Sequence, residues 1–202
     1  MPHLVLLGDS VFDNANYVAE GRATIDAFRA HVPHGWRVTL LAQDGSTIDE
    51  IGRQLVHLPS DATHIAVSTG GNDALRDAGI LTEHAGTVAE ALWKLGHVAE
   101  RFERRYLEML RKVRSRNVPA LACTIYNAHF GDAHLRLIAA TALSVFNDAI
   151  TRAAASISIP IVDLRAICDE PEDYVNEIEP SGRGSEKIAG AVVGKLVGEA
   201  RG

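Results

Sequence analysis

The stretch that decides the fold is Leu4-Val5-Leu6-Leu7-Gly8-Asp9-Ser10. Its four apolar residues predict a buried strand, and the residues that follow, Val11-Phe12-Asp13-Asn14, do not continue that strand. Gly8 permits a sharp turn because it has no side chain, and Asp9 can accept hydrogen bonds from nearby amides in that turn. Ser10 is then held at the carboxyl end of a strand, where open α/β sheets place their ligands.

Strands and helices alternate along the rest of the chain. The sequence predicts further strands over residues 37–42, 64–68, 120–125 and 160–164, and helices over residues 46–58, 88–117, 135–156 and 185–200. Such alternation predicts a parallel sheet covered by helices on both faces, with the strand-to-helix loops at one edge. We therefore expect an α/β fold, a three-layer α/β/α sandwich whose five-stranded parallel sheet has the order 2-1-3-4-5. Residues 1–202 are expected to form a single domain.

The longest predicted helix, residues 88–117, carries an apolar stripe at helical spacing. The side chains expected to face inward are Leu92, Leu95, Phe102, Tyr106, Met109 and Val113. Its other face is rich in arginine with glutamate interleaved, which is typical of a solvated surface. The segment before it, residues 77–87, could cover a pocket, and the sequence leaves open whether it acts as a lid.

Composition excludes several classes of protein. The 202 residues are 47% hydrophobic and 23% charged, as is ordinary for a globular protein. The net charge of −6 argues against nucleic acid as a partner, and no apolar run approaches the length of a membrane span. The first residues do not resemble a secretory signal, and no metal-ligand spacing links Cys123 to Cys168. We expect a cytoplasmic protein with no metal and no cofactor, and the sequence leaves the oligomeric state open.

The predicted loops at the carboxyl edge of the sheet carry groups suited to acyl transfer. Ser10 offers a hydroxyl nucleophile, Gly45 an unobstructed backbone amide, and Asn72 a side-chain amide donor. A hydroxyl that attacks a carbonyl and donors that stabilise the resulting oxyanion are the components of this reaction. Each residue alone also fits ordinary turn chemistry, and Ser10 could simply cap a helix.

Together these residues resemble the GDSL, or SGNH, hydrolases. Three signature blocks match in order and spacing, namely Gly8-Asp9-Ser10, Gly45 and Gly70-Gly71-Asn72-Asp73. The resemblance covers nearly the whole chain and implies a flavodoxin-like sheet and a serine hydrolase of esterase, lipase, thioesterase or deacetylase type. It implies a small-molecule substrate with a short acyl or acetyl ester. It also implies Ser10 as nucleophile and an oxyanion hole formed by the amides of Ser10 and Gly45 and the side chain of Asn72.

Secondary candidates for substrate binding or support lie in the same loops. They are Asp9, Asp13, Asn14, Asp73 and His129.

The last signature block departs from the family pattern, which is Asp-x-x-His-Pro before the final helix. The matching stretch is Asn176-Glu177-Ile178-Glu179-Pro180. Asn176 therefore stands where the aspartate is expected, and Glu179 stands where the histidine base is expected. A carboxylate with the ordinary pKa of about 4.3 is a weak base near neutral pH, although burial and acidic neighbours raise such a pKa.

Three hypotheses account for the missing histidine. In the first, Glu179 is the general base, with Asn176 holding it in place by a hydrogen bond. In the second, His129 supplies the base from the loop after the fourth strand. In the third, the chain has lost hydrolysis and binds a ligand or a partner in the same pocket.

Overall fold

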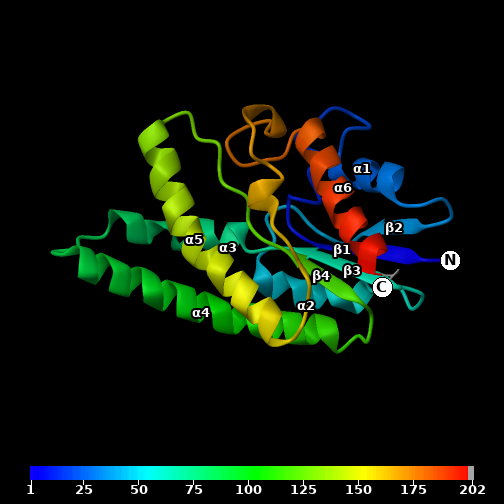
Figure 1. Ribbon diagram of the computed structural model, residues 1–202, viewed down its shortest axis with the longest axis horizontal. Coiled ribbons are helices and arrows are strands. Elements are labelled where there is room, and N and C mark those ends of the chain that lie inside the picture. The colour runs from blue at the N-terminus through cyan, green and yellow to red at the C-terminus, as the bar shows by residue number, and fades with distance from the viewer. Residues whose placement is uncertain (200–202) are drawn as a thin grey trace.

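The computed structural model describes residues 1–199, which form a five-stranded parallel sheet with helices on both sides (Figure 1). The strands are β1 (His3–Gly8), β2 (Arg37–Leu40), β3 (His64–Ser68), β4 (Ala120–Cys123) and β5 (Ile161–Val162). Their order is β2-β1-β3-β4-β5, and every neighbouring pair is parallel. The predicted fold class and strand order are confirmed. β2, β4 and β5 are shorter than predicted.

Six α-helices cover the sheet. They are α1 (Thr24–His31), α2 (Ile51–Gln54), α3 (Gly71–Asp77), α4 (Val88–Arg114), α5 (Ala133–Ser156) and α6 (Gly182–Glu199). Short 3₁₀ helices lie between them: η1 (Ile48–Glu50), η2 (Leu55–His57), η3 (Ala78–Thr82), η4 (Leu164–Ala166) and η5 (Pro171–Asp173). Within residues 1–199, no helix combines the length and apolar composition that crossing a bilayer needs.

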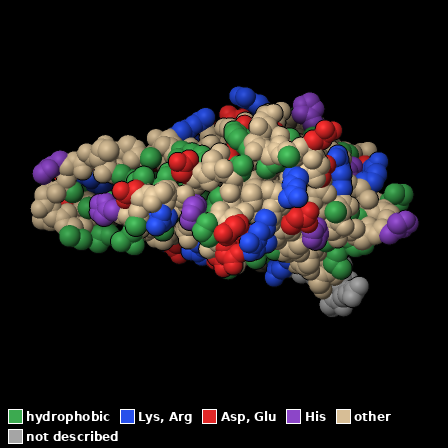
Figure 2. All heavy atoms as spheres, turned by 90° about the horizontal axis from the view of Figure 1, so that it is seen from above, with side chains coloured by type: hydrophobic (Ala, Val, Ile, Leu, Met, Phe, Trp, Pro, Cys, Tyr) green, Lys and Arg blue, Asp and Glu red, His purple; other side chains and the backbone are tan. Residues whose placement is uncertain are grey.

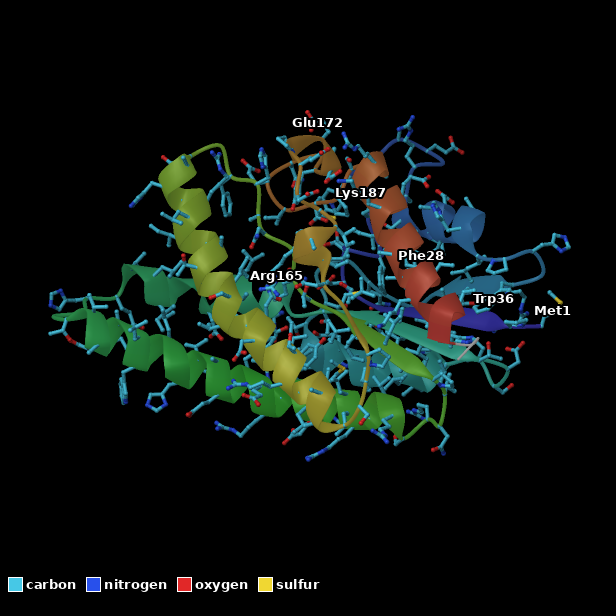
Figure 3. The ribbon with its side chains drawn as sticks, viewed as in Figure 1. Met1, Phe28, Trp36, Arg165, Glu172 and Lys187 are labelled. Carbon is cyan, nitrogen blue, oxygen red and sulfur yellow. The ribbon has the colours of Figure 1, made fainter. Side chains whose placement is uncertain are left out.

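β1 is buried on both faces because its side chains alternate between two cores. Leu4 and Leu6 pack with α1 and α6, where Phe28 is fully buried (Figure 3). Val5 and Leu7 pack on the other face, in the core formed with α2, α4 and α5. This two-sided burial explains why the first strand is a continuous apolar run rather than an alternating one.

The first turns of α4 project beyond the end of the sheet (Figure 1). Leu92 lies there and is 62% exposed, so the prediction that it faces the core is wrong. The rest of the predicted stripe is buried or half-buried, because only the later turns of α4 have the sheet and α5 to pack against. Acidic and basic side chains are interspersed over the face shown in Figure 2.

Gly8 sets the position of the first turn. Its φ is +141°, and a Cβ atom at this position would lie 1.8 Å from the carbonyl oxygen of Ser68 at the end of β3. The side chain of Gln54 in α2 closes the turn, since it accepts a hydrogen bond from the Gly8 amide and donates one to the Gly8 carbonyl, both at 2.8 Å. Only glycine allows this close approach of β1 to β3.

We expect Gly8→Ala to lower the free energy of unfolding by about 3 kcal/mol or more, because it adds an unfavourable φ to a backbone clash. Chemical denaturation of the purified variant measures the change. Gly194→Ala in α6 is the matched control, since a Cβ atom there meets nothing within 4 Å. The control should be neutral or slightly stabilising. Equal stability of the two variants would contradict the role of Gly8.

Candidate active site

Ser10 and Glu179 are in direct contact although 169 positions separate them in the sequence. The Ser10 hydroxyl donates a hydrogen bond to Oε1 of Glu179 at 3.0 Å. Ser10 follows β1, and Glu179 lies in the loop between η5 and α6. Both side chains are well buried, with 9% and 5% of their surfaces exposed. A carboxylate at this distance is placed to accept the hydroxyl proton.

Asn176 supports Glu179 through the backbone. Its Oδ1 accepts hydrogen bonds from the amides of Ile178 and Glu179, both at 2.9 Å. The hydroxyl of Tyr126 fixes the same loop by donating to the carbonyl of Ile178 at 2.7 Å. The predicted hydrogen bond between Asn176 and Glu179 is present, and it is made to the backbone amide of Glu179, so Asn176 shapes the loop that presents the carboxylate.

Asn14 ties the loop after β1 to the loop before α6. It is fully buried, and its Nδ2 donates to the carbonyl of Pro180 and to the hydroxyl of Ser185, both at 3.0 Å. Its Oδ1 accepts a hydrogen bond from the amide of Thr24 at 2.7 Å. Both polar atoms of this amide are engaged within the protein, in three hydrogen bonds, so Asn14 positions Glu179 relative to Ser10 rather than contacting a substrate.

A salt-bridged cluster holds the segment before Glu179 against α6. Asp173 is fully buried, and its Oδ2 accepts a hydrogen bond from Nζ of Lys187 at 2.7 Å. Figure 3 shows Lys187 on α6 beside the loop that carries Glu172. Gly184 packs directly against the backbone of Asp173. A Cβ atom at position 184 would lie 2.2 Å from the carbonyl oxygen of Asp173.

The pKa of Glu179 is raised to about 7, chiefly by burial and to a lesser extent by the negative charge of Asp44, while the hydrogen bond from the Ser10 hydroxyl opposes the shift. The second carboxylate oxygen, Oε2, is buried and has no hydrogen-bond partner among the described residues. Burial also raises the pKa of Asp9 to about 7, with a smaller contribution from Glu179. The site therefore holds two buried carboxyl groups that change charge near neutral pH.

Asn72 lies in the first turn of α3 and lines the same cavity as Ser10 and Glu179. Its Nδ2 donates a hydrogen bond to the carbonyl of Ser46 at 2.9 Å. Gly45, the neighbour of Ser46, has a φ of +76° and lies on an exposed loop that does not line this cavity. Asn72 thus lines the same cavity as Ser10, and its hydrogen bond reaches the residue that follows Gly45.

Two of the candidate carboxylates hold the loop of Gly45. Asp13 accepts a hydrogen bond from the amide of Asp44 at 3.0 Å. Asp73 accepts one from the amide of Ile48 at 3.0 Å and another from Arg105 at 2.9 Å. Both residues therefore support the architecture of the site, and Asp73 does so from a buried position.

His129 contacts Tyr174 and the loop before Glu179. Its ring stacks on Tyr174 with a centroid separation of 5.7 Å, and its amide donates to the carbonyl of Glu177 at 2.7 Å. It does not line the cavity around Ser10, although its neighbours Ala128 and Phe130 do.

The cavity has a volume of about 230 Å³. Its polar end includes Asp9, Ser10, Asn72 and Glu179. Thr69 also lies there, and its hydroxyl is buried without a hydrogen-bond partner in the described part of the chain. Sequence reasoning missed Thr69, although its place directly after β3 and before Gly70-Gly71 marks it as a loop residue at the same edge.

Among residues 1–199, no group of three or more histidine, cysteine or acidic side chains is arranged to hold a metal ion.

The fold and the cavity define a flavodoxin-like α/β/α protein with a serine hydroxyl, a carboxylate and an amide at the carboxyl edge of the sheet. The model of the GDSL-like lipase/acylhydrolase family matches residues 6–187, and the chain belongs to that family. Comparison with curated proteins finds no match.

Solved structures share the fold over nearly their whole length. An extracellular lipase from Streptomyces rimosus is 15% identical, with a TM-score of 0.70 and coverage of 98% of this chain and 99% of the lipase. A phospholipase A1 from Streptomyces albidoflavus NA297 is also 15% identical, with a TM-score of 0.70 and 98% of both chains covered. A lipase/acylhydrolase from Enterococcus faecalis is 20% identical, with a TM-score of 0.66 and coverage of 98% and 97%. The family match supports an ester hydrolase, and these solved structures share its fold.

The raised pKa of Glu179 makes a prediction about stability. The folded protein holds this proton more tightly than the unfolded chain, whose carboxyl has the ordinary pKa of 4.5. Stability is therefore lost as the pH rises from about 4.5 to about 7. Glu179→Gln removes this loss. We expect the free energy of unfolding of the variant, minus that of the parent, to be about 1–3 kcal/mol larger at pH 8 than at pH 4.

Denaturation curves at pH 4 and pH 8 measure this effect. Glu177→Gln is the control, because it removes an exposed carboxylate from the same loop, and it should leave the pH dependence unchanged. If Glu179→Gln and the parent lose stability equally between the two pH values, Glu179 does not carry the raised pKa.

Proposed function

We propose that this protein hydrolyses carboxylic esters through Ser10, with Glu179 as the general base. The observation that carries the proposal is the 3.0 Å hydrogen bond from the Ser10 hydroxyl to the buried carboxylate of Glu179. Glu179 accepts the hydroxyl proton as Ser10 Oγ forms a bond to the carbonyl carbon of the ester. When the bond from that carbon to the alcohol oxygen breaks, Glu179 returns the proton to the departing alcohol.

The second half of the reaction reverses these roles. Water enters the place of the alcohol and gives a proton to Glu179 as its oxygen bonds to the acyl carbon. The bond to Ser10 Oγ then breaks, and the proton on Glu179 passes back to Ser10. Oε2 of Glu179, which has no partner among the described residues, offers an acceptor for that water.

The raised pKa suits Glu179 to this role. A general base is most effective when its pKa lies near the working pH, and burial brings the pKa of Glu179 to about 7. A carboxylate with an ordinary pKa would be a much weaker base. Burial in apolar surroundings thus gives this carboxylate a pKa close to that of an ordinary imidazole.

The oxyanion formed in each half needs hydrogen-bond donors. Asn72 has two N–H groups on Nδ2, and the bond to the Ser46 carbonyl uses one and fixes the orientation of the amide. The second N–H is left for the oxyanion. We propose the backbone amide of Ser10 as a further donor, and that of Gly45 on the family resemblance alone, since Gly45 does not line the cavity.

The alternative is a protein that binds a ligand in this cavity without hydrolysing it, and the departure from the Asp-x-x-His block favours it. A base at His129 has less support, since its ring stacks on Tyr174.

A cavity of about 230 Å³ supports a small-molecule substrate. A cytoplasmic location stays a prediction from the sequence.

Removal of the proposed base gives a direct test. We expect Glu179→Gln to lower kcat/KM for a chromogenic ester by roughly 100-fold or more, the usual contribution of general base catalysis. The kcat/KM of the parent should rise with pH through an apparent pKa of about 7, since the ionised carboxylate is the working form. Ser10→Ala should abolish the reaction, whereas His129→Ala should keep most of it. Full activity of Glu179→Gln would exclude Glu179 as the base, and no hydrolysis by the parent would favour the binding alternative.

The oxyanion hole is tested separately. We expect Asn72→Ala to lower kcat by about 100- to 1000-fold with a small change in KM, because the donor acts mainly in the transition state. Thermal unfolding of the same variant shows whether the loss of the bond to Ser46 has loosened the fold. A variant with normal kcat, or one whose loss appears only in KM, would count against Asn72 as an oxyanion donor.

A further inference from the structure

The cavity next to Ser10 is polar at one end and apolar at the other. The polar end holds the Ser10–Glu179 pair and the unpartnered hydroxyl of Thr69. The remainder is lined by residues of α3, η3, α4 and α5. Asp77 is the charged residue in that part of the lining, and its carboxylate pairs with Arg101 at 3.2 Å.

The apolar end is lined by aliphatic and small side chains and by the aromatic rings of Phe130 and Phe146. The aliphatic and small residues include Leu75, Ile80, Leu95, Val98, Ala142 and Leu143. A space with this lining excludes polar groups, because a polar group would lose its hydrogen bonds with water there. It offers favourable burial only to a hydrocarbon portion of a substrate.

From this arrangement we infer that the apolar end binds the acyl chain of the substrate and selects a chain of medium length, roughly eight to ten carbons. This inference rests on the proposed function and goes further than the short acyl or acetyl group implied by the family resemblance. An apolar cavity of about 150 Å³ accommodates benzene, a ligand of about six carbons. The volume here is about 230 Å³, so an acetyl group would leave most of it empty.

The acyl side of the ester fits this space better than the alcohol side. The acyl group stays bound to Ser10 after the alcohol has left, and water must then reach the acyl carbon through the place of the alcohol. An alcohol chain held between α4 and α5 would have to withdraw from the apolar end before each deacylation. An acyl chain held there leaves that path open during the second half of the reaction.

Two alanines of α5 set the depth of the cavity. Ala139 and Ala142 are three residues apart, so they lie on the same face of the helix, and both line the apolar end. A larger side chain at Ala142 would occupy space that the acyl chain otherwise fills. Leu143 lines the same end, and shortening it should deepen the cavity.

The test is a series of p-nitrophenyl esters with acyl groups from two to sixteen carbons, assayed by kcat/KM. We expect the octanoyl or decanoyl ester to exceed the acetyl ester by about 100-fold or more, since each buried methylene contributes a few-fold. Ala142→Phe should lower the octanoyl value at least tenfold and change the acetyl value less than threefold. Leu143→Ala should move the optimum to longer chains, which keeps the inference testable if Ala142→Phe fails to fold.

Ser144→Phe is the matched control, because it adds the same bulk to an exposed position of α5. It should leave the chain-length profile unchanged. Ethyl octanoate and octyl acetate, compared on the parent, separate the two sides of the ester, and ethyl octanoate should be preferred. A flat or acetyl-centred profile, a preference for octyl acetate, or equal effects of Ala142→Phe on all chain lengths would overturn the inference while leaving ester hydrolysis intact.

A parent protein that cleaves none of these esters would instead overturn the proposed function. Calorimetric titration with octanoate then decides the inference without turnover. Octanoate binding that Ala142→Phe weakens and Ser144→Phe does not would support the chain-binding cavity. Absence of octanoate binding would overturn it.

Discussion

The contact between Ser10 and Glu179 depends on two loops from opposite ends of the chain meeting at one edge of the sheet. The turn at Gly8 brings the first loop against β3, where no other residue would fit beside the Ser68 carbonyl. Asn14 then joins this loop to the segment of Pro180 through its fully buried amide. Because these contacts are short and buried, the hydroxyl and the carboxylate are held in place before any substrate arrives, which reduces the reorganisation that catalysis requires.

Burial has opposite consequences for stability and for chemistry at this site. An ionised carboxylate in an apolar cavity is unfavourable, and the raised pKa values of Glu179 and Asp9 are the measure of that cost. The same environment makes the Glu179 carboxylate a stronger base and strengthens the hydrogen bonds around it. Burial raises the pKa of Asp73 as well, and the hydrogen bond from the Ile48 amide and the positive charge of Arg105 oppose that shift.

The fold could be predicted from the sequence because the apolar runs and their spacing define each strand and helix. The proximity of Ser10 and Glu179 was also accessible, since both lie in loops at the carboxyl edge. The donors that bind Oδ1 of Asn176 were not, because which amides point toward it depends on loop geometry. Nor was the stacking of His129 on Tyr174, which follows from the meeting of two loops 45 residues apart in the sequence. The exposure of Leu92 and the apolar cavity depend on where the sheet ends beneath α4, which periodicity alone does not reveal.

The hydrogen bonds of Asn176 have a consequence for how such a site can change in evolution. They bind only the amides of residues 178 and 179, and so do not depend on which side chain position 179 carries. An aspartate at position 176 would accept the same two bonds. These two backbone bonds are therefore compatible with an imidazole or a carboxylate at position 179. In the mechanism proposed above, a change of that one side chain alters the pKa of the base, and with it the working pH, without requiring a change in either bond.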